Sequence, residues 1–185
     1  ISLDWLVERG WLDQPLPPKI DRDEHARLLA RSATRFFAAA NTDWRQRFDE
    51  FVAQNGYWLP DYSLYQALKL AHHDRDWQQW PEPLRERQSA ALAQARQEHR
   101  ASIDLALFCQ FVFFTQWQEL RSLAAELGIQ LFGDMPIYVS MDSADVWAAR
   151  ENFLIDDDGQ CEYVAGVPPD AFSDDGQLWG NPLFD

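Results

Sequence analysis

One carboxylate, Asp134, lies where a parallel sheet would place a ligand-binding group. It comes directly after a short apolar run, which itself follows a helical pattern. A helix that leads into a short buried strand is typical of parallel α/β sheets, and carboxylates just past such strands lie on the ligand-binding edge. We therefore expect a strand within residues 129–139 and a carboxylate that accepts hydrogen bonds from a ligand. The alternative is that Asp134 only caps a turn, because Met135 and Pro136 follow it.

A second group of polar and aromatic side chains lies in residues 164–182, a stretch rich in Pro, Gly, Asp and Trp. Pro168 and Pro169 stiffen its approach, and Gly176 supplies a bend. A long loop of this composition is usually functional, and we expect little regular structure in it. The alternative is a packed surface loop with Trp179 buried. The candidate ligand-binding residues here are Asp170, Phe172, Gln177, Trp179 and Asn181.

Metal and thiol chemistry find no support in the sequence. Neither Cys109 nor Cys161 belongs to a CxxC motif or a Cys/His cluster, so no disulfide scaffold or zinc site is expected. The four histidines are not spaced with other residues as metal ligands would be, and the His72-His73 pair predicts a solvated turn. The acidic run at 156–158 lacks the rest of a calcium loop and predicts a surface turn. We expect no metal and no cofactor.

Charge and composition exclude several classes of partner. The net charge of −14 disfavours phosphate backbones and anionic membranes, but it is compatible with a neutral polar ligand. The longest apolar run is too short to span a bilayer, and no signal peptide is evident. We therefore expect a cytoplasmic protein without nucleic-acid or membrane partners. The nine Trp, twelve Phe and five Tyr can stack on sugars, although most should lie in the core.

The elements that position these groups are mostly helical. Apolar spacing predicts helices over residues 23–40, from about Arg47 to Gly56 and over 63–71, with a proline-rich turn at 14–19. The charged, Gln- and Ala-rich stretch at 84–101 predicts one long solvated helix. A further helix carries an apolar stripe and ends at Gly128. The stripe consists of Phe113, Trp117, Leu120, Ala124 and Leu127.

Four motifs in order give the sequence a family resemblance. They are Gly133-Asp-Met-Pro-Ile-Tyr-Val139, Asp142-Ser-Ala-Asp-Val-Trp147, Val164-Ala-Gly-Val-Pro-Pro-Asp170 and Gly176-Gln-Leu-Trp-Gly-Asn-Pro182. With these motifs the chain resembles the 4-α-glucanotransferase family, of the amylomaltase or disproportionating type. Upstream, Tyr57-Trp-Leu-Pro-Asp61 is also similar to this family, though less specifically.

The resemblance implies an α/β fold, namely part of a (β/α)8 TIM barrel with a helical insertion subdomain on the N-terminal side. The expected division is a largely helical subdomain over residues 1–105 and a barrel segment over residues 106–185. The latter comprises a helix, a strand ending at Asp134 and a substrate-covering loop. As a fragment the chain should be mostly helical.

The resemblance also implies roles for single residues. In the family an acid at the position of Asp134 lines the donor sugar subsite, and the loop with Asp170, Phe172, Gln177 and Trp179 folds over the substrate. Asn181 would orient the base of this loop. The family often has an aromatic residue where this chain has Ala171, so no stacking role is assigned there. The surroundings of the family's nucleophile are absent, and no catalytic residue is assigned in this chain.

The expected function is therefore that of part of a 4-α-glucanotransferase, which transfers α-1,4-glucan segments to a sugar hydroxyl by retaining chemistry. The fragment alone should be inactive, with the nucleophile and the acid/base beyond residue 185. The expected partner is a maltooligosaccharide or another α-1,4-glucan, and exposed apolar surface would allow the fragment to self-associate. The alternatives are a non-catalytic carbohydrate-binding module and a helical interaction protein.

Overall fold

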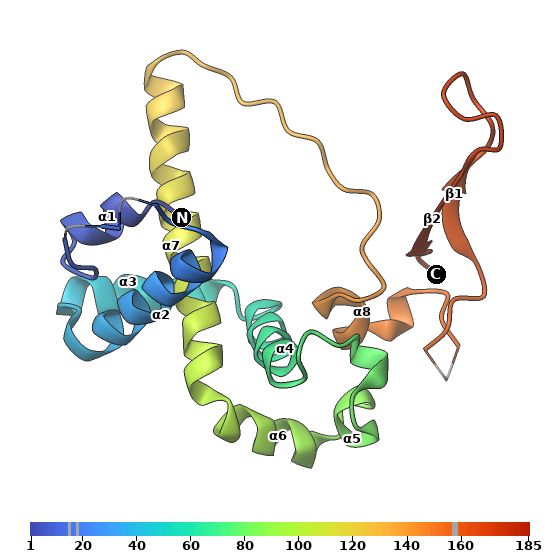
Figure 1. Ribbon diagram of the computed structural model, residues 1–185, viewed down its shortest axis with the longest axis horizontal. Helices are drawn as coiled ribbons and strands as arrows, with labels where there is room; N and C mark the ends of the chain where they lie inside the picture. Colours follow the sequence, from blue (N-terminus) through green and yellow to red (C-terminus); the bar gives the residue numbers. More distant parts are fainter. Residues whose placement is uncertain (15, 18, 157–158) are drawn as a thin grey trace. The chain divides into compact units, whose positions relative to one another are not determined.

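The computed structural model describes residues 1–14, 16–17, 19–156 and 159–185 (Figure 1). The chain forms two compact units. Unit 1 comprises residues 1–63 and 99–132, and unit 2 comprises residues 64–98 and 133–185. Parts of the predicted turns at 14–19 and 156–159 lie outside the described residues.

Unit 1 is helical. Its elements are α1 (Leu3–Glu8), α2 (Arg22–Ala39), α3 (Thr42–Gln54) and α7 (Arg100–Glu126), and α4 (Leu59–Ala71) begins in it. Asp21 and Asn41 cap α2 and α3 by accepting hydrogen bonds from the backbone amides of Glu24 and Trp44. The helix stop at Gly128 is confirmed, because Gly128 follows α7 with a φ of 69°.

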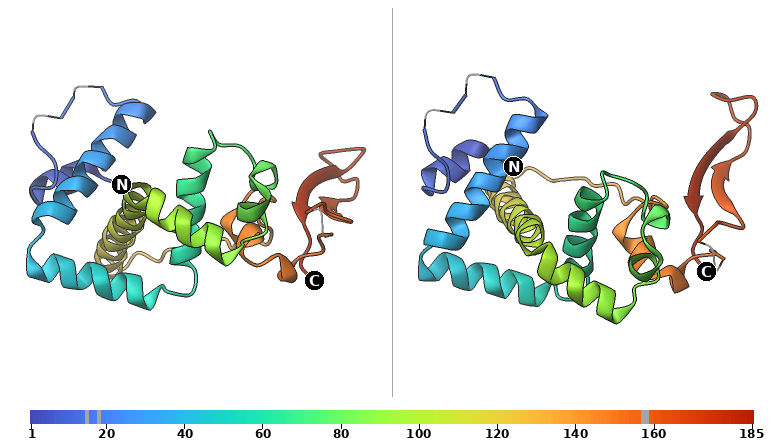
Figure 2. Two further views of the ribbon diagram at one scale, coloured as in Figure 1. Left: turned by 90° about the horizontal axis from the view of Figure 1, so that it is seen from below. Right: turned by 60° about the horizontal axis from the view of Figure 1, so that its bottom comes forward.

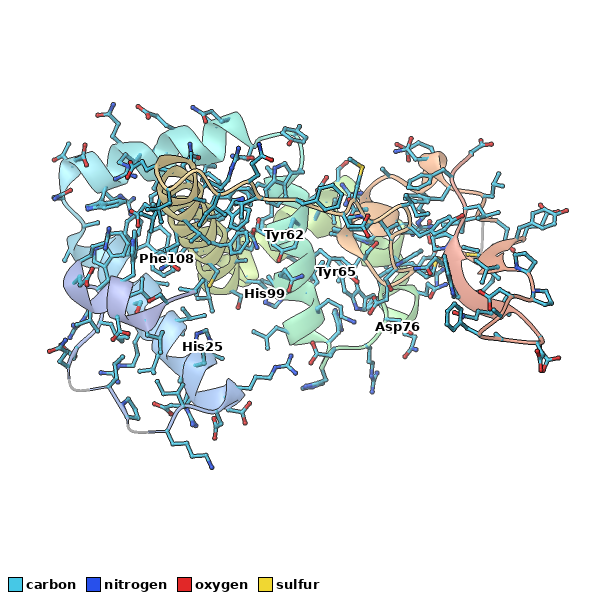
Figure 3. The ribbon with its side chains drawn as sticks, turned by 90° about the horizontal axis from the view of Figure 1, so that it is seen from above. His25, Tyr62, Tyr65, Asp76, His99 and Phe108 are labelled. Atoms are coloured by element: carbon cyan, nitrogen blue, oxygen red, sulfur yellow. The ribbon has the colours of Figure 1, made fainter. Side chains whose placement is uncertain are left out.

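Aromatic rings make the core of unit 1, where α2 and α3 pack against α7 (Figure 2). Phe36 and Phe108 are fully buried, with ring centroids 5.3 Å apart, and Phe108 is labelled in Figure 3. Trp11 meets Phe36 edge to face at 4.8 Å. Most of the N-terminal aromatics are thus core residues, as their composition predicted.

The prediction of one continuous helix over residues 84–101 is wrong. Two shorter helices, α5 (Glu82–Arg85) and α6 (Ser89–Glu98), occupy this region, and α7 starts at Arg100. Arg87 has a φ of 51°, which no α-helix accommodates. The backbone therefore breaks between α5 and α6, although the sequence between them has ordinary helix formers.

Unit 2 is built around tryptophans. Trp77 in the short 3₁₀ helix η1 (Trp77–Gln79) and Trp147 in α8 (Ala144–Ala148) are fully buried. Trp80 contacts both Trp147 and Tyr65 of α4. A second 3₁₀ helix, η2 (Arg150–Asn152), follows α8. Trp147 is therefore a core residue, in line with the expectation that most aromatic side chains lie in the core.

The strand expected within residues 129–139 does not form. In the structure these residues carry no strand or helix and connect α7 to the region of α8 (Figure 1). Phe132, Met135 and Ile137 are exposed, so Phe132 departs from the expectation that most aromatic side chains lie in the core. A strand is stabilised by pairing with a neighbour, and among the described residues none pairs with this segment. Its apolar composition alone cannot hold it in a sheet.

The stretch at 164–182 is more regular than predicted. Strands β1 (Val164–Val167) and β2 (Gln177–Pro182) pair in an antiparallel hairpin. Val167 pairs with Gln177, and the register shifts between Val164 and Gly166. The described residues thus form a mostly helical fold with one two-stranded sheet and no barrel.

No helix in the described part of the chain combines the length and the apolar content that crossing a bilayer requires.

Candidate functional site

The predicted ligand-binding residues all lie in unit 2. Polar contacts around Asp142 hold the part of the chain between Asp134 and the hairpin. Lys69 Nζ lies 2.6 Å from Asp142 Oδ2, and the Tyr65 hydroxyl donates to Asp142 Oδ1 over 2.6 Å. The backbone amide of Trp77 donates to the same oxygen. One carboxylate thus accepts bonds from α4 and from η1.

The surroundings of Asp142 stabilise its charged form. Burial alone would raise the pKa of Asp142, but the hydrogen bonds from Lys69 and Tyr65 outweigh it and hold the pKa below its usual range. Burial, followed by the hydrogen bond to Asp142, raises the pKa of the Tyr65 hydroxyl. Asp142 is therefore an anion, and Tyr65 is a neutral donor at neutral pH.

The hairpin is tied to the segment that carries Asp134. The side-chain amide of Asn181 donates to the backbone carbonyl of Val139 over 2.8 Å, and the Trp179 ring lies 6.0 Å from the ring of Tyr138. The indole nitrogen of Trp77 also donates to the carbonyl of Met141. Residues 138–142 are thus held from two sides, by β2 and by η1.

Two glycines permit the tight hairpin. Gly176 has a φ of 72°, and a Cβ atom there would lie 2.4 Å from the carbonyl oxygen of Val167. A Cβ atom at Gly166 would lie 2.7 Å from the carbonyl oxygen of Gln177. Such distances are shorter than any tolerable contact, so both positions require glycine.

Asp170 shapes the tip of the hairpin loop. Its Oδ1 accepts hydrogen bonds from the backbone amides of Phe172 and Ser173, at 2.8 and 2.9 Å. Its own amide donates to the carbonyl of Ser173, and the Ser173 hydroxyl donates to the carbonyl of Gly176. This is an Asx-type turn, in which a short polar side chain replaces backbone partners. The observed contacts of Asp170 are thus structural.

Phe172, Gln177 and Trp179 present their side chains to solvent. Phe172 is 94% exposed and Trp179 is 46% exposed, so the alternative of a buried Trp179 is wrong. The indole nitrogen of Trp179 donates to Oε1 of Gln177 over 3.0 Å, which fixes the ring beside a polar amide. A flat aromatic face next to an amide is an arrangement that suits a polar, ring-shaped ligand.

Asp134 stands apart from these contacts. It is exposed in the unpaired segment 129–139, and none of the described residues donates a hydrogen bond to its carboxylate. The structure therefore brings Asn181 and Trp179 to residues 138–139, but it does not join Asp134 to the loop. A turn-capping role for Asp134 has no support in these contacts.

Sequence reasoning missed Lys69, Tyr65 and Asp142. Their separations of 73 and 77 residues leave no local pattern, although Asp142 opens one of the family-like motifs. Among the described residues no group of three His, Cys, Asp or Glu side chains is placed to hold a metal ion.

Comparison with known proteins gives a family match for the whole chain. Residues 1–185 match the family described as 4-alpha-glucanotransferase. The 4-alpha-glucanotransferase of Thermus thermophilus is 42% identical over 193 residues, which cover all of this chain and 38% of that protein. The enzyme of the same name from Synechocystis is 41% identical over 198 residues, covering 100% and 39%.

A solved structure agrees with these relatives. The amylomaltase from Streptococcus agalactiae in complex with acarbose matches with a TM-score of 0.90 and 33% sequence identity, over 100% of this chain and 40% of that chain. This chain thus has the fold of the corresponding part of an amylomaltase, and it spans about two fifths of the length of the relatives it matches. The chain belongs to the 4-alpha-glucanotransferase family.

Proposed function

We propose that the protein containing this chain transfers α-1,4-glucan segments from a donor to a sugar hydroxyl of an acceptor, by retaining chemistry. The observation that carries the proposal is the family match over all 185 residues. The similarity to an amylomaltase that was solved with acarbose supports an oligosaccharide as the ligand.

Retaining transfer needs two carboxyl groups about 5 Å apart, one as nucleophile and one as acid/base. We assign neither to this chain, and we place both outside its 185 residues. This placement agrees with the share of the relatives that the chain spans, about two fifths of their length. The chain would then supply binding groups and no catalytic carboxylate.

In this proposal the segment at 129–139 and the hairpin loop form part of the sugar-binding surface. Asp134 accepts hydrogen bonds from hydroxyls of the donor sugar, and its exposure leaves the carboxylate free to do so. Phe172, Gln177 and Trp179 cover the acceptor and limit the entry of water, which would otherwise hydrolyse the glycosyl intermediate. Asp170 and Asn181 hold the loop in shape through their backbone contacts.

The proposal also covers the barrel and the helical subdomain to which the residues of this chain would belong. Segment 129–139 becomes a strand of a (β/α)8 barrel when neighbouring strands pair with it, and residues 106–185 belong to this barrel. Residues 1–105 form the helical insertion subdomain. The cytoplasm remains the proposed location.

A substitution in the full-length protein tests the binding role of Asp134. Asp134→Asn should lower glucose release from maltotriose by about a hundredfold, the scale expected when a positioned polar contact near the reacting bond is lost. The matched control is Asp23→Asn, an exposed carboxylate in α2, which should leave the rate unchanged. A near-wild-type rate in Asp134→Asn would remove this residue from the site.

The 185-residue chain on its own tests where the catalytic groups lie. The purified chain should neither release glucose from maltotriose nor redistribute chain lengths. Any such activity would show that the catalytic carboxylates are within it. Light scattering on the same sample tests self-association, which the exposed side chains of Leu120 and Leu123 on α7 support.

A further inference from the structure

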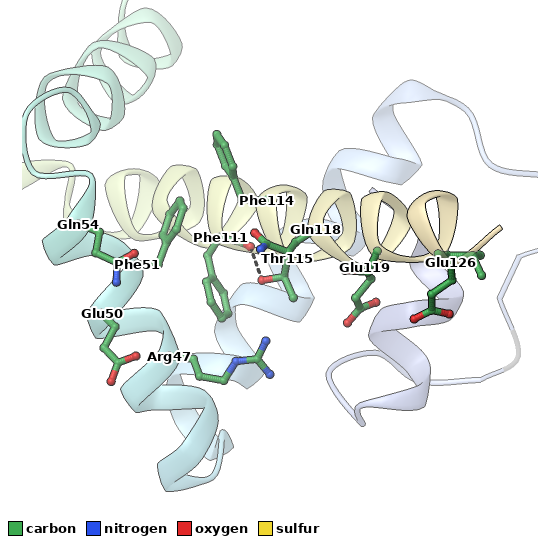
Figure 4. A pocket seen from close by; sticks show the side chains of 12 residues that line it. Arg47, Glu50, Phe51, Gln54, Phe111, Phe114, Thr115, Gln118, Glu119 and Glu126 are labelled. Atoms are coloured by element: carbon green, nitrogen blue, oxygen red, sulfur yellow. Dashed lines mark hydrogen bonds between the residues drawn. The ribbon is translucent and has the colours of Figure 1, made fainter. Parts of the chain in front are cut away.

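A groove with a volume of about 600 Å³ lies between α3 and α7 in unit 1 (Figure 4). Its base includes Phe111, which is only 3% exposed. Phe51 and Phe114 contribute rings whose centroids are 5.6 Å apart. The volume is within the usual range of small-ligand sites, and the rings offer apolar faces.

Three polar side chains along the same groove have no hydrogen-bond partner in the part of the chain that the structure describes. The side-chain amides of Gln54 and Gln118 and the hydroxyl of Ser122 make no hydrogen bond with the described residues. The Thr115 hydroxyl donates to the carbonyl of Phe111, so its oxygen is left as an acceptor (Figure 4). Amides and hydroxyls both donate and accept, which is the pattern that a sugar hydroxyl matches.

The charges of the groove disfavour anionic ligands. The lining contains one arginine, Arg47, and three glutamates, Glu50, Glu119 and Glu126. Glu119 is already engaged, because it accepts hydrogen bonds from the indole nitrogen of Trp5 and from Arg9. An excess of carboxylates repels phosphates and acidic peptides, while carboxylates accept hydrogen bonds from neutral hydroxyls.

An apolar partner would bind elsewhere on α7. At 100° per residue, Phe113, Trp117 and Leu120 lie on the side of the helix opposite to Gln118 and Ser122. These three side chains are 40–52% exposed, so the apolar face of α7 is available for protein contacts. The α3–α7 groove differs from that face because unpaired amides and a hydroxyl lie beside its exposed apolar side chains, Phe114 and Leu123.

We propose that the groove between α3 and α7 is an accessory binding site for a neutral α-glucan segment. Phe51 and Phe114 pack on the C–H faces of a glucose unit, and Gln54, Gln118 and Ser122 bond its hydroxyls. The choice of an α-glucan rests on the proposed function, whereas the neutral, hydroxyl-rich class follows from the lining itself. The groove is open to solvent, so the affinity is weak, with a Kd of about 1 mM.

Affinity electrophoresis tests the groove with soluble amylose as the probe. The full-length protein runs in native gels with increasing amylose, and its retardation gives a dissociation constant. The double substitution Gln54→Ala/Gln118→Ala should raise this constant at least about fivefold, since it removes two of the unpaired amides. Ser122→Trp, which fills the groove with a large ring, should do the same. Gln94→Ala on α6, whose amide bonds Glu98 outside the groove, is the matched control and should change nothing.

Glucose release from maltotriose is measured in parallel and separates the two proposals. An enzyme that transfers glucan but is retarded equally in all variants would overturn the accessory site. A protein that transfers no glucan, yet loses retardation only in the groove variants, would overturn the proposed function and support the site. Thermal unfolding of each variant shows whether it is folded. The double variant removes polar groups and Ser122→Trp fills the groove, so the test still holds if only one of the two variants folds.

Discussion

Lys69 Nζ bonds Asp142 Oδ2 at 2.6 Å and also donates to the carbonyls of Asp74 and Arg75. A single ammonium group therefore joins the end of α4, the turn after it and the segment that precedes α8. With 15% of the Lys69 side chain and 28% of the Asp142 side chain exposed, the pair is largely withdrawn from water. Charge-assisted hydrogen bonds in such surroundings contribute more than surface ion pairs do.

We expect Lys69→Met to destabilise the protein by about 2 kcal/mol, because it leaves a half-buried carboxylate without its cationic partner. Urea unfolding followed by tryptophan fluorescence measures the change. The double variant Lys69→Met/Asp142→Asn should recover part of the loss, since no unpaired charge then remains. Additive losses would show that the two groups do not interact.

The stability contributed by Asp142 should depend on pH. Its pKa is lower in the folded protein than in the unfolded chain, where it is about 3.9. The folded state thus favours the anion. The contribution is complete above the unfolded pKa and is lost as the pH falls through the folded pKa. The difference in unfolding free energy between the wild type and Asp142→Asn should shrink from about pH 5 downward. A difference that is constant down to pH 3 would contradict this assignment.

Gly176→Ala should destabilise the hairpin by about 2–4 kcal/mol. The new Cβ would clash with the carbonyl of Val167, and the positive φ of an alanine adds a conformational cost. Gly180→Ala is the matched control. Gly180 has a similar φ of 76°, but a Cβ there meets nothing within 4 Å. Its cost should be only about 1 kcal/mol, the conformational part alone. Thermal unfolding of both variants measures the difference, and equal losses would exclude the steric contact.

Asp170→Ala should loosen the loop tip, because the amides of Phe172 and Ser173 lose their acceptor. Their hydrogen exchange should accelerate about tenfold, as expected when a bond of about 1.4 kcal/mol is lost. Asp170→Asn keeps an oxygen at the same place and should preserve most of the protection. Fast exchange of these amides in the wild type would show that the turn does not persist in solution.

Cys109 should react slowly with thiol reagents at pH 8. Burial raises the pKa of its thiol to about 11, so little thiolate is present. Burial is also the main cause that raises the pKa of Cys161, but Cys161 lies in a less enclosed part of unit 2. Labelling with a disulfide reagent should therefore modify Cys161 first, and Cys161→Ser should remove the fast phase. A fast phase that survives this substitution would contradict the prediction.

Helices were the most predictable part of the fold, because their signals are local. The periodicity over residues 23–40 and the stop at Gly128 correspond to α2 and to the end of α7. The break at Arg87 was not predictable, since a positive φ at an arginine is imposed by tertiary contacts. The prediction of a strand at 129–139 was wrong for a related reason, because a strand depends on pairing partners that local composition does not reveal.

In the candidate site, too, local sequence signals predicted some features, while features that depend on distant contacts were missed. The motifs predicted the loop residues of the candidate site, which stay a prediction, and the structure shows Trp179 and Asn181 in contact with residues 138–139. The hairpin was missed because its glycines were interpreted as loop formers, although two of them allow close backbone approach. The contacts of Asp142 join residues 65 to 77 positions apart, which a single sequence does not encode in any local pattern.

The exposed side of α7 has a consequence for the energetics of unfolding. Leu120, Leu123 and Leu127 are more than half exposed in the native chain, so unfolding adds little to their contact with water. Both the heat-capacity change and the urea dependence of unfolding scale with newly exposed surface. The isolated chain should therefore unfold with a smaller heat-capacity increment and a broader urea transition than a compact domain of equal length.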